Sequence, residues 1–252
     1  MKNLLEFKNV KYFYQTKENE IEALSDISFS VEDQSFTSLV GPSGCGKTTI
    51  LSLSAGLLSP SSGQILLDGS KIEQNDNRIG YMFQRDHLFE WRTIWQNITL
   101  GLELQKKKKD EKKLDLANRL LKKYDLYNFK NQKPRQLSGG MRQRVALIRT
   151  LVLEPALLLL DEPFSALDFQ TRLKVCDDVY NIIKSENKTA LLVTHDISEA
   201  LSMSDKIVIL SKRPATVKEE MKISFEGDTP LHKREAPSFG SYFEKIWRNL
   251  AT

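Results

Sequence analysis

Gly41-Pro42-Ser43-Gly44-Cys45-Gly46-Lys47-Thr48 is the stretch from which the fold can be argued, because it has the glycine spacing and Lys-Thr ending of a phosphate-binding loop. The apolar run Ser38-Leu39-Val40 precedes it, and helical periodicity begins at Thr49. In such a strand-to-helix turn, several backbone N–H groups point at one anion, and the helix N-terminus adds its partial positive charge. The stretch therefore predicts binding of a nucleoside triphosphate, against the alternative of a glycine-rich turn without chemistry.

The side chains of this loop add what its backbone cannot supply. Lys47 brings a mobile positive charge to the phosphates, and Thr48 brings a hydroxyl suited to Mg²⁺. Cys45 lies at a helix N-terminus, which favours a thiolate, so we expect thiol reagents to inhibit the protein. The residues expected to contact the nucleotide are Gly41, Pro42, Ser43, Gly44, Cys45, Gly46, Lys47, Thr48 and Thr49.

Length, charge and cysteine content limit the classes of protein to which this chain can belong. The 252 residues suffice for one large domain or two closely joined ones. Lys and Arg number 37 against 33 Asp and Glu, and a net charge of +4 dispersed along the chain gives no reason to expect nucleic acid as a partner. Two cysteines imply no disulfide framework, and no apolar run approaches the ~20 residues that span a bilayer. We therefore expect a cytoplasmic protein that reaches any membrane through a partner.

Short runs bounded by turn residues predict strands near the N-terminus. Strands are expected over residues 4–14, 21–40 with a turn at 33–35, and 78–83, and residues 64–72 read as a hairpin turning at Asp68-Gly69. A helix is expected over residues 49–58. Tyr14 is the candidate to stack on an adenine ring, with Tyr12 as the alternative, and a purely structural role for these aromatics remains open.

The spacing of apolar residues changes twice after the first predicted strands. Residues 85–154 carry apolar side chains at helical spacing, over 98–105, 114–124 and 141–153, and predict a helical insert. Strands at 156–160, 190–193 and 206–210 then alternate with helices at 165–185 and 197–202, which predicts a largely parallel sheet. The tail after Pro214 ends in an amphipathic pattern over 239–250, expected to pack on this chain rather than on a partner.

Two carboxylates and a histidine follow predicted strands. Asp161 and Glu162 end the run Leu157-Leu158-Leu159-Leu160, and His195 follows a second strand in the same way. The carboxyl ends of parallel strands form the edge at which α/β sheets bind ligands. We expect Asp161 to reach Mg²⁺, Glu162 to orient the attacking water, and His195 to contact the γ-phosphate, although carboxylates that merely close a strand and a packing histidine are the alternatives.

A second glycine-rich turn, Leu137-Ser138-Gly139-Gly140-Met141, precedes a helical run. Ser138 can cap that helix, and Gly139 and Gly140 leave backbone donors uncovered at its positive end, so the turn predicts a second anion site. One nucleotide needs two such turns only if they close on it from opposite sides.

With these motifs in order, residues 4–212 resemble the ATP-binding subunit of an ABC transporter. The matches are the Walker A loop (Gly41 to Thr48), the glutamine loop (Gln84), the signature (Leu137 to Met141), Walker B (Leu157 to Glu162), the D-loop (Ser165 to Asp168) and the switch histidine (His195). The resemblance implies ATP and Mg²⁺ as cofactors, with Thr48, Gln84 and Asp161 at the metal. It also implies nucleotide contacts by Ser138, Gly139, Gly140 and Asp168, and catalysis by Glu162, His195, Gln84 and Lys47.

The fold that the resemblance implies is an α/β P-loop NTPase core with a mostly parallel sheet, an N-terminal antiparallel β subdomain and an inserted helical subdomain. Residues 1–84 and 155–212 would form the core, 85–154 the signature subdomain and 213–252 an extension. Two copies would sandwich ATP head to tail at the cytoplasmic face of the membrane. A permease would dock through a coupling helix, with a solute-binding protein as an indirect partner.

Three further segments resemble those of the ATP-binding subunits of importers of nitrate, sulfonates, taurine or pyrimidine precursors. These are the segments Phe83 to Thr93 and Leu137 to Arg144, and the exit at Arg213-Pro214. The chain departs from the usual pattern at Met141, at Glu90 where Pro is frequent, and at Asp33-Gln34-Ser35 in place of Gly-Glu. The alternatives are a soluble ABC ATPase acting on nucleic acid, ribosomes or cofactor assembly, and an exporter subunit.

Overall fold

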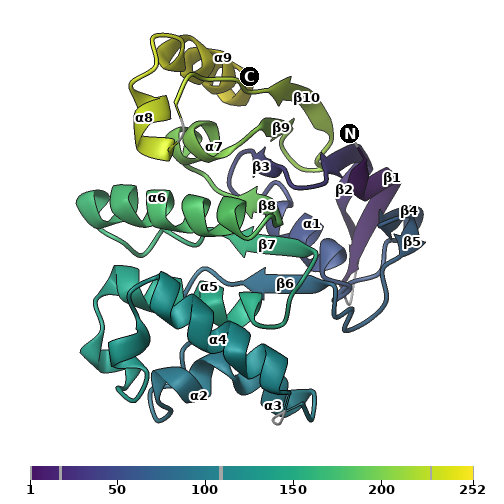
Figure 1. Ribbon diagram of the computed structural model, residues 1–252. Helices are drawn as coiled ribbons and strands as arrows, with labels where there is room; N and C mark the ends of the chain where they lie inside the picture. The colour runs from purple at the N-terminus through teal and green to yellow at the C-terminus, as the bar shows by residue number, and fades with distance from the viewer. Residues whose placement is uncertain (1, 17–18, 108–109, 228, 252) are drawn as a thin grey trace.

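The structure, a computed structural model, describes residues 2–16, 19–107, 110–227 and 229–251. Its centre is a six-stranded, mostly parallel sheet with helices packed on both faces (Figure 1). A four-stranded antiparallel sheet lies beyond one of these faces, next to helix α1 (Lys47–Ser54). This is the α/β architecture expected from the sequence.

The larger sheet has the strand order β10-β9-β3-β8-β7-β6. Its strands are β3 (Phe36–Val40), β6 (Ile79–Met82), β7 (Leu157–Asp161), β8 (Thr189–Val193), β9 (Lys206–Leu210) and β10 (Val217–Lys222). All neighbouring pairs are parallel except β9 with β10. The prediction of a largely parallel sheet is confirmed, whereas β10 was not predicted.

Strand β7 shows why a continuous apolar run is needed at the centre of the sheet. Leu157 and Leu159 pack with α1 and the antiparallel sheet, whereas Leu158 and Leu160 pack with the helices on the opposite face. All four side chains are fully buried. The two sides of β7 therefore pack into two separate hydrophobic clusters. Asp161, the last residue of β7, lies at the carboxyl edge of the sheet.

The antiparallel sheet has the order β2-β1-β4-β5. Its strands are β1 (Asn3–Gln15), β2 (Glu20–Glu32), β4 (Ser62–Leu67) and β5 (Ser70–Lys71). Asp68 and Gly69 both have positive φ, at 51° and 74°, as a two-residue hairpin turn requires, so the predicted hairpin is confirmed. The predicted turn at residues 33–35 is confirmed too, and it carries the chain from one sheet to the other.

Helix α1 begins at Lys47 and ends at Ser54, so the predicted bounds of 49–58 are wrong at both ends. The phosphate loop already has helical backbone at Lys47. Gly56, with φ of 67°, turns the chain out of the helix before Leu57 and Leu58. Likewise α6 (Phe169–Ser185) begins four residues later than predicted, because Asp168 caps it by accepting a hydrogen bond from the Thr171 N–H.

Residues 94–151 fold into helices on one side of the larger sheet (Figure 1). The described residues between 85 and 154 include no strand, as predicted. The helices are α2 (Ile94–Ile98), α3 (Leu100–Leu104), α4 (Glu111–Lys123), α5 (Gly139–Leu151) and the 3₁₀ turns Tyr127–Phe129 and Pro134–Gln136. The helix predicted over 98–105 corresponds to α3, whereas Ile98 is the last residue of α2. Thr99 separates the two helices because its backbone, with φ of −86° and ψ of 3°, departs from helical geometry.

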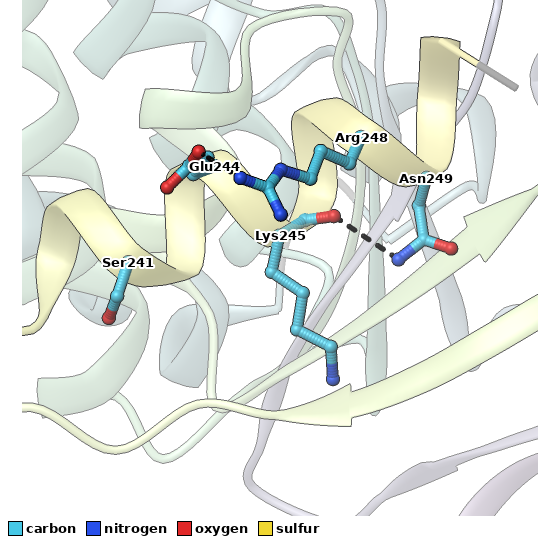
Figure 2. Close-up of a pocket in the computed structure, with 5 residues that line it drawn as sticks. All are labelled: Ser241, Glu244, Lys245, Arg248 and Asn249. Carbon is cyan, nitrogen blue, oxygen red and sulfur yellow. Dashed lines mark hydrogen bonds and ion pairs between the residues drawn. The ribbon is translucent and has the colours of Figure 1, made fainter.

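The C-terminal part packs on the body of the chain, as predicted. Helix α9 (Phe239–Ala251) buries Ile246 completely against α7 (Ile197–Met203) and strand β9, and α8 (Pro230–Arg234) lies between α6 and α9 (Figure 1). Helix α9 also carries a shallow pocket of about 440 Å³ that its own residues line (Figure 2). Lys245 Nζ and Asn249 Nδ2 lie 2.5 and 3.0 Å from the Glu219 carboxylate of β10, which fixes α9 along that strand.

Candidate ATP site

The phosphate loop joins β3 to α1 and is folded around its own lysine. Lys47 Nζ donates to the carbonyl oxygens of Gly41 at 2.7 Å and Pro42 at 3.0 Å. Gly44 and Gly46 have φ of 72° and 120°, a region that other residues rarely adopt. A side chain at Gly46 would also lie 2.8 Å from Leu24. The loop therefore has the curled backbone that a phosphate cradle needs.

The first turn of α1 presents two threonines to different sides. Thr48 is exposed beside the exposed loop residues Ser43 and Gly44, where an anion would sit. Thr49 is buried, and its hydroxyl lies 2.8 Å from the hydroxyl of Tyr14. The structure therefore places Tyr14 beside the phosphate loop.

Two tyrosines compete for the predicted adenine contact. The ring of Tyr12 packs against the core of the antiparallel sheet, whereas Tyr14 is 37% exposed. The guanidinium carbon of Arg213 lies 5.9 Å from the centre of the Tyr14 ring. The exposure favours Tyr14 over Tyr12 as the stacking ring, and adenine stacking stays a prediction.

The expectation of a thiolate at Cys45 is wrong, whereas inhibition by thiol reagents stays a prediction. Its side chain is 1% exposed within the core shared by α1 and the antiparallel sheet. Burial raises the pKa of the Cys45 thiol, and this effect exceeds the opposing influence of Lys47. The helix N-terminus therefore does not yield a thiolate here, because desolvation opposes the charge.

Asp161 ends β7 and receives a hydrogen bond that the sequence did not predict. The Tyr81 hydroxyl, from the neighbouring strand β6, donates to Asp161 Oδ2 at 3.0 Å. Burial raises the pKa of Asp161, while the hydrogen bond from Tyr81 lowers it. Burial and the Asp161 charge also raise the pKa of Tyr81, so this hydroxyl remains a donor. Tyr81 thus holds one oxygen of a carboxylate that is predicted to reach a metal.

Glu162 and His195 meet at the carboxyl edge of the sheet. His195 Nδ1 lies 3.0 Å from Glu162 Oε2, and the Glu162 N–H donates to the carbonyl of Val193 at 2.9 Å. Glu162 has φ of 43°, a conformation uncommon outside glycine. The two residues predicted to orient water and contact the γ-phosphate therefore lie in direct contact, on adjacent strand ends.

Gln84 is linked to the same edge through a serine. Gln84 Nε2 lies 3.2 Å from the Ser165 hydroxyl, which in turn donates to the carbonyl oxygen of Glu162 at 3.0 Å. Ser165 had been predicted only as part of the D-loop. The structure therefore brings together, after strands β6, β7 and β8, the side chains of Gln84, Asp161, Glu162 and His195.

The oxygen donors at this edge fit Mg²⁺. A magnesium ion at a phosphate site usually takes one or two protein ligands and completes its shell with water and phosphate oxygens. The described residues contain no group of three or more His, Cys, Asp or Glu that could hold an ion alone. Thr48, Gln84 and Asp161 offer a hydroxyl, an amide and a carboxylate, which are all oxygen donors that this ion prefers.

The second glycine turn starts α5. The Ser138 hydroxyl accepts a long hydrogen bond of 3.4 Å from the Met141 N–H, as a cap, and Ser138 and Gly139 are exposed. Gly140 is buried, and a side chain there would lie 2.8 Å from Val175 of α6. Among the described residues, no hydrogen bond or ion pair joins this turn to the phosphate loop. Asp168 is likewise exposed and occupied in capping α6.

No helix within the described ranges has both the length and the apolar character needed to cross a bilayer.

A family model described as ABC transporter matches residues 24–165. The uncharacterized ABC transporter ATP-binding protein YtlC of Bacillus subtilis is 45% identical over 98% of this chain and 96% of its own length. The nitrate import ATP-binding protein NrtD of a Synechocystis species is 38% identical over 96% of this chain and 93% of its own length.

A solved structure of an ATP-binding cassette is also similar to this chain. It is the dimeric, post-hydrolysis state of the ATP-binding cassette MJ0796 bound to ADP and Pi, with a TM-score of 0.71 and 32% identity. The match covers 87% of this chain and 99% of that one. Together with the phosphate loop and the residues at the sheet edge, these likenesses show that the chain belongs to the ABC transporter family, as an ATP-binding subunit of the kind that hydrolyses ATP.

Proposed function

We propose that this chain is the ATPase subunit of an importer of a small solute, and that two copies close head to tail on two molecules of ATP. The observation that carries the proposal is the separation of the two anion sites. The phosphate loop and the catalytic edge are assembled within one copy, whereas the exposed turn Ser138 to Gly140 makes no hydrogen bond to them among the described residues. A second copy can bring that turn to the open side of the phosphate loop.

The residues then have distinct roles in hydrolysis. Lys47 would leave the carbonyl oxygens that it now contacts and bind the phosphates, while the backbone of residues 41–48 surrounds them. Glu162 would orient a water molecule for in-line attack, and His195, 3.0 Å from it, would contact the γ-phosphate. Thr48, Gln84 and Asp161 would hold Mg²⁺, which when bound neutralises charge on the phosphates.

The partner proposed for this ATPase is an integral membrane permease. Residues 85–154 would carry the signature turn and, with the segment after Gln84, form the groove for a coupling helix. A solute-binding protein would act indirectly, at the other side of the membrane. The name of the Synechocystis relative supports nitrate or a similar small anion, and sulfonates, taurine and pyrimidine precursors complete the proposed class of solutes.

Substitution of Glu162 by Gln tests the dimer and the role of Glu162 together. It keeps the shape of the side chain and removes its charge, so we expect ATP hydrolysis in the assembled transporter to fall by about a hundredfold or more, with ATP affinity changed by less than about threefold. Size-exclusion chromatography of the E162Q protein should show a dimer with ATP and a monomer with ADP.

Two results would contradict the proposal. Normal hydrolysis by the E162Q transporter would remove the assigned role of Glu162. A monomer with bound ATP would remove the dimer. Affinity purification of the wild-type chain from membranes should also recover a permease, whereas recovery of nucleic acid without a membrane protein would point to a soluble ABC ATPase.

A further inference from the structure

Arg172, in the first turn of α6, faces two loops that follow different strands. Its Nη2 donates to the carbonyl oxygen of Leu167 at 3.0 Å. Its Nη1 lies 3.5 Å from Asp196 Oδ2. Leu167 belongs to the loop between β7 and α6, and Asp196 follows His195 directly. One guanidinium therefore contacts both loops at the catalytic edge.

The residues on both sides of His195 are held by the groups that Arg172 faces. Asp196 caps α7, because its Oδ1 accepts from the N–H groups of Ser198 at 2.8 Å and Glu199 at 3.2 Å. The Thr194 hydroxyl donates to the buried carboxylate of Glu199 at 2.7 Å and accepts from the Asp196 N–H at 3.0 Å. The position of His195 thus depends on this small network, and Arg172 is the neighbouring positive charge on α6.

The other contact of Arg172 leads to the signature turn. A side chain at Gly139 would lie 3.1 Å from Leu167 Cδ2, so the Gly139 backbone packs closely against Leu167. The next residue, Asp168, caps α6 and fixes the turn of which Arg172 is part. A displacement of the exposed turn Ser138 to Gly140 would therefore be transmitted to Leu167 and its carbonyl oxygen.

The buried nitrogen of the guanidinium, Nε, has no hydrogen-bond partner. Arg172 Nε is buried, and the facing Glu199 Oε1 lies 3.8 Å away, too far for a hydrogen bond. A buried donor without a partner is unfavourable, and a small approach of α6 and the His195 loop would satisfy it. The contact is thus incomplete in the single copy and would improve if the two loops moved together.

We propose that Arg172 is a positioning residue that links the two ATP sites of the dimer. In a head-to-tail pair, Ser138 to Gly140 of one copy covers the ATP of the other copy, while His195 serves the ATP of its own. The contacts from Gly139 through Leu167 and Arg172 to Asp196 then run between the two sites within one chain. This inference rests on the proposed dimer, in which closure on one ATP would draw His195 into place at the other.

Hydrogen exchange in the E162Q background tests the link. On addition of ATP, the parent should gain protection at both ends of the contact chain, in residues 138–141 and 194–199. With Arg172→Met added, we expect the gain at 138–141 to remain and the gain at 194–199 to be about tenfold smaller, because a charge-assisted hydrogen bond and an ion pair are lost. Arg172→Lys, which keeps the charge but lacks the fork, should restore part of that gain.

Lys174→Met is the matched control, because Lys174 is an exposed cation two residues further along α6. It should leave both gains unchanged. Equal protection at 194–199 in Arg172→Met and the parent would overturn the proposal. Loss of both gains in Arg172→Met alone would overturn it too, since Arg172 would then support the dimer contact itself. A parent that stays monomeric with ATP would instead reject the proposed dimer.

Discussion

The hydrogen bond from Tyr81 to Asp161 favours the ionised form of the carboxylate predicted to reach Mg²⁺. Burial alone favours the neutral form of Asp161 and raises its pKa. The Tyr81 hydroxyl, 3.0 Å away, stabilises the ionised form. A metal ligand must be ionised at the working pH, so the phenol compensates for part of the desolvation that the sheet edge imposes.

Replacement of Tyr81 by Phe should therefore raise the pKa of Asp161 further. Activity that needs the ionised carboxylate is lost as pH falls through that pKa, so the acid limb of the ATPase profile should move to higher pH, by up to about one unit. The measurement is kcat/KM against pH at saturating Mg²⁺. Tyr14→Phe removes a hydroxyl that bonds Thr49 and not Asp161, so it should leave the acid limb in place. An unshifted limb in Tyr81→Phe would mean that Asp161 is ionised without the phenol.

Site residues that a motif predicts are positioned by local sequence, whereas the contacts found only in the structure depend on how distant segments pack. Lys47, Thr48, Asp161 and His195 follow predicted strands, so local sequence places them at one edge of the sheet. The contacts of Tyr81 with Asp161 and of Ser165 with Gln84 instead join residues 80 and 81 positions apart. The contact of Tyr81 depends on β6 lying beside β7 in a particular register, which local pattern does not contain. The Cys45 expectation failed for a related reason, since burial overrode the local charge.

At the scale of elements, α9 is the part of the chain whose use the sequence left most open. Its apolar face packs on α7 and β9, and polar residues of the same helix line the pocket in Figure 2. Asn249 and Leu250, near its end, line a second pocket together with Pro42 of the phosphate loop. Helix α9 therefore packs on β9 and is bonded to β10, and its end faces the phosphate loop across this second pocket.

Truncation of Ile246 to Ala should measure that packing. Ile246 is fully buried, so the change should lower the free energy of unfolding by about 2–5 kcal/mol. Trp247→Ala, at the next position and 59% exposed, should cost less than about 1 kcal/mol. Thermal denaturation of the two variants makes the comparison. Similar destabilisation in both would show that α9 does not pack through Ile246.

Secondary structure was predictable where apolar residues recur at helical spacing or form a continuous run, and was not where most side chains are charged. Helices α4, α5 and α9 and strands β7 to β9 lie close to their predicted positions. Strand β10 was missed, because four of its six residues are charged and its pairing with β9 is a tertiary contact. The start of α6 depends on a cap at Asp168 that the apolar pattern alone does not reveal.

At the scale of the whole molecule, the chain carries two unlike halves of an ATP site on different elements. The phosphate loop, Asp161, Glu162 and His195 lie at the carboxyl edge of the larger sheet, whereas Ser138 to Gly140 start α5 on the helical side (Figure 1). If each half pairs with the complementary half of a second copy, two defects in different copies can compensate for each other. The same defects cannot compensate if one copy encloses ATP alone.

Mixing two inactive variants decides between these arrangements. Lys47→Ala removes the phosphate contact and keeps the signature, while Ser138→Arg blocks the signature and keeps the phosphate loop. Half of the dimers in an equal mixture should be mixed, and each mixed dimer has one intact site out of two, so ATPase activity should recover to about one quarter of the wild-type value. Each variant alone should remain inactive, with thermal denaturation showing that both are folded. Cross-linking should show the mixed dimers, and a mixture as inactive as its components would then contradict shared sites that hydrolyse independently.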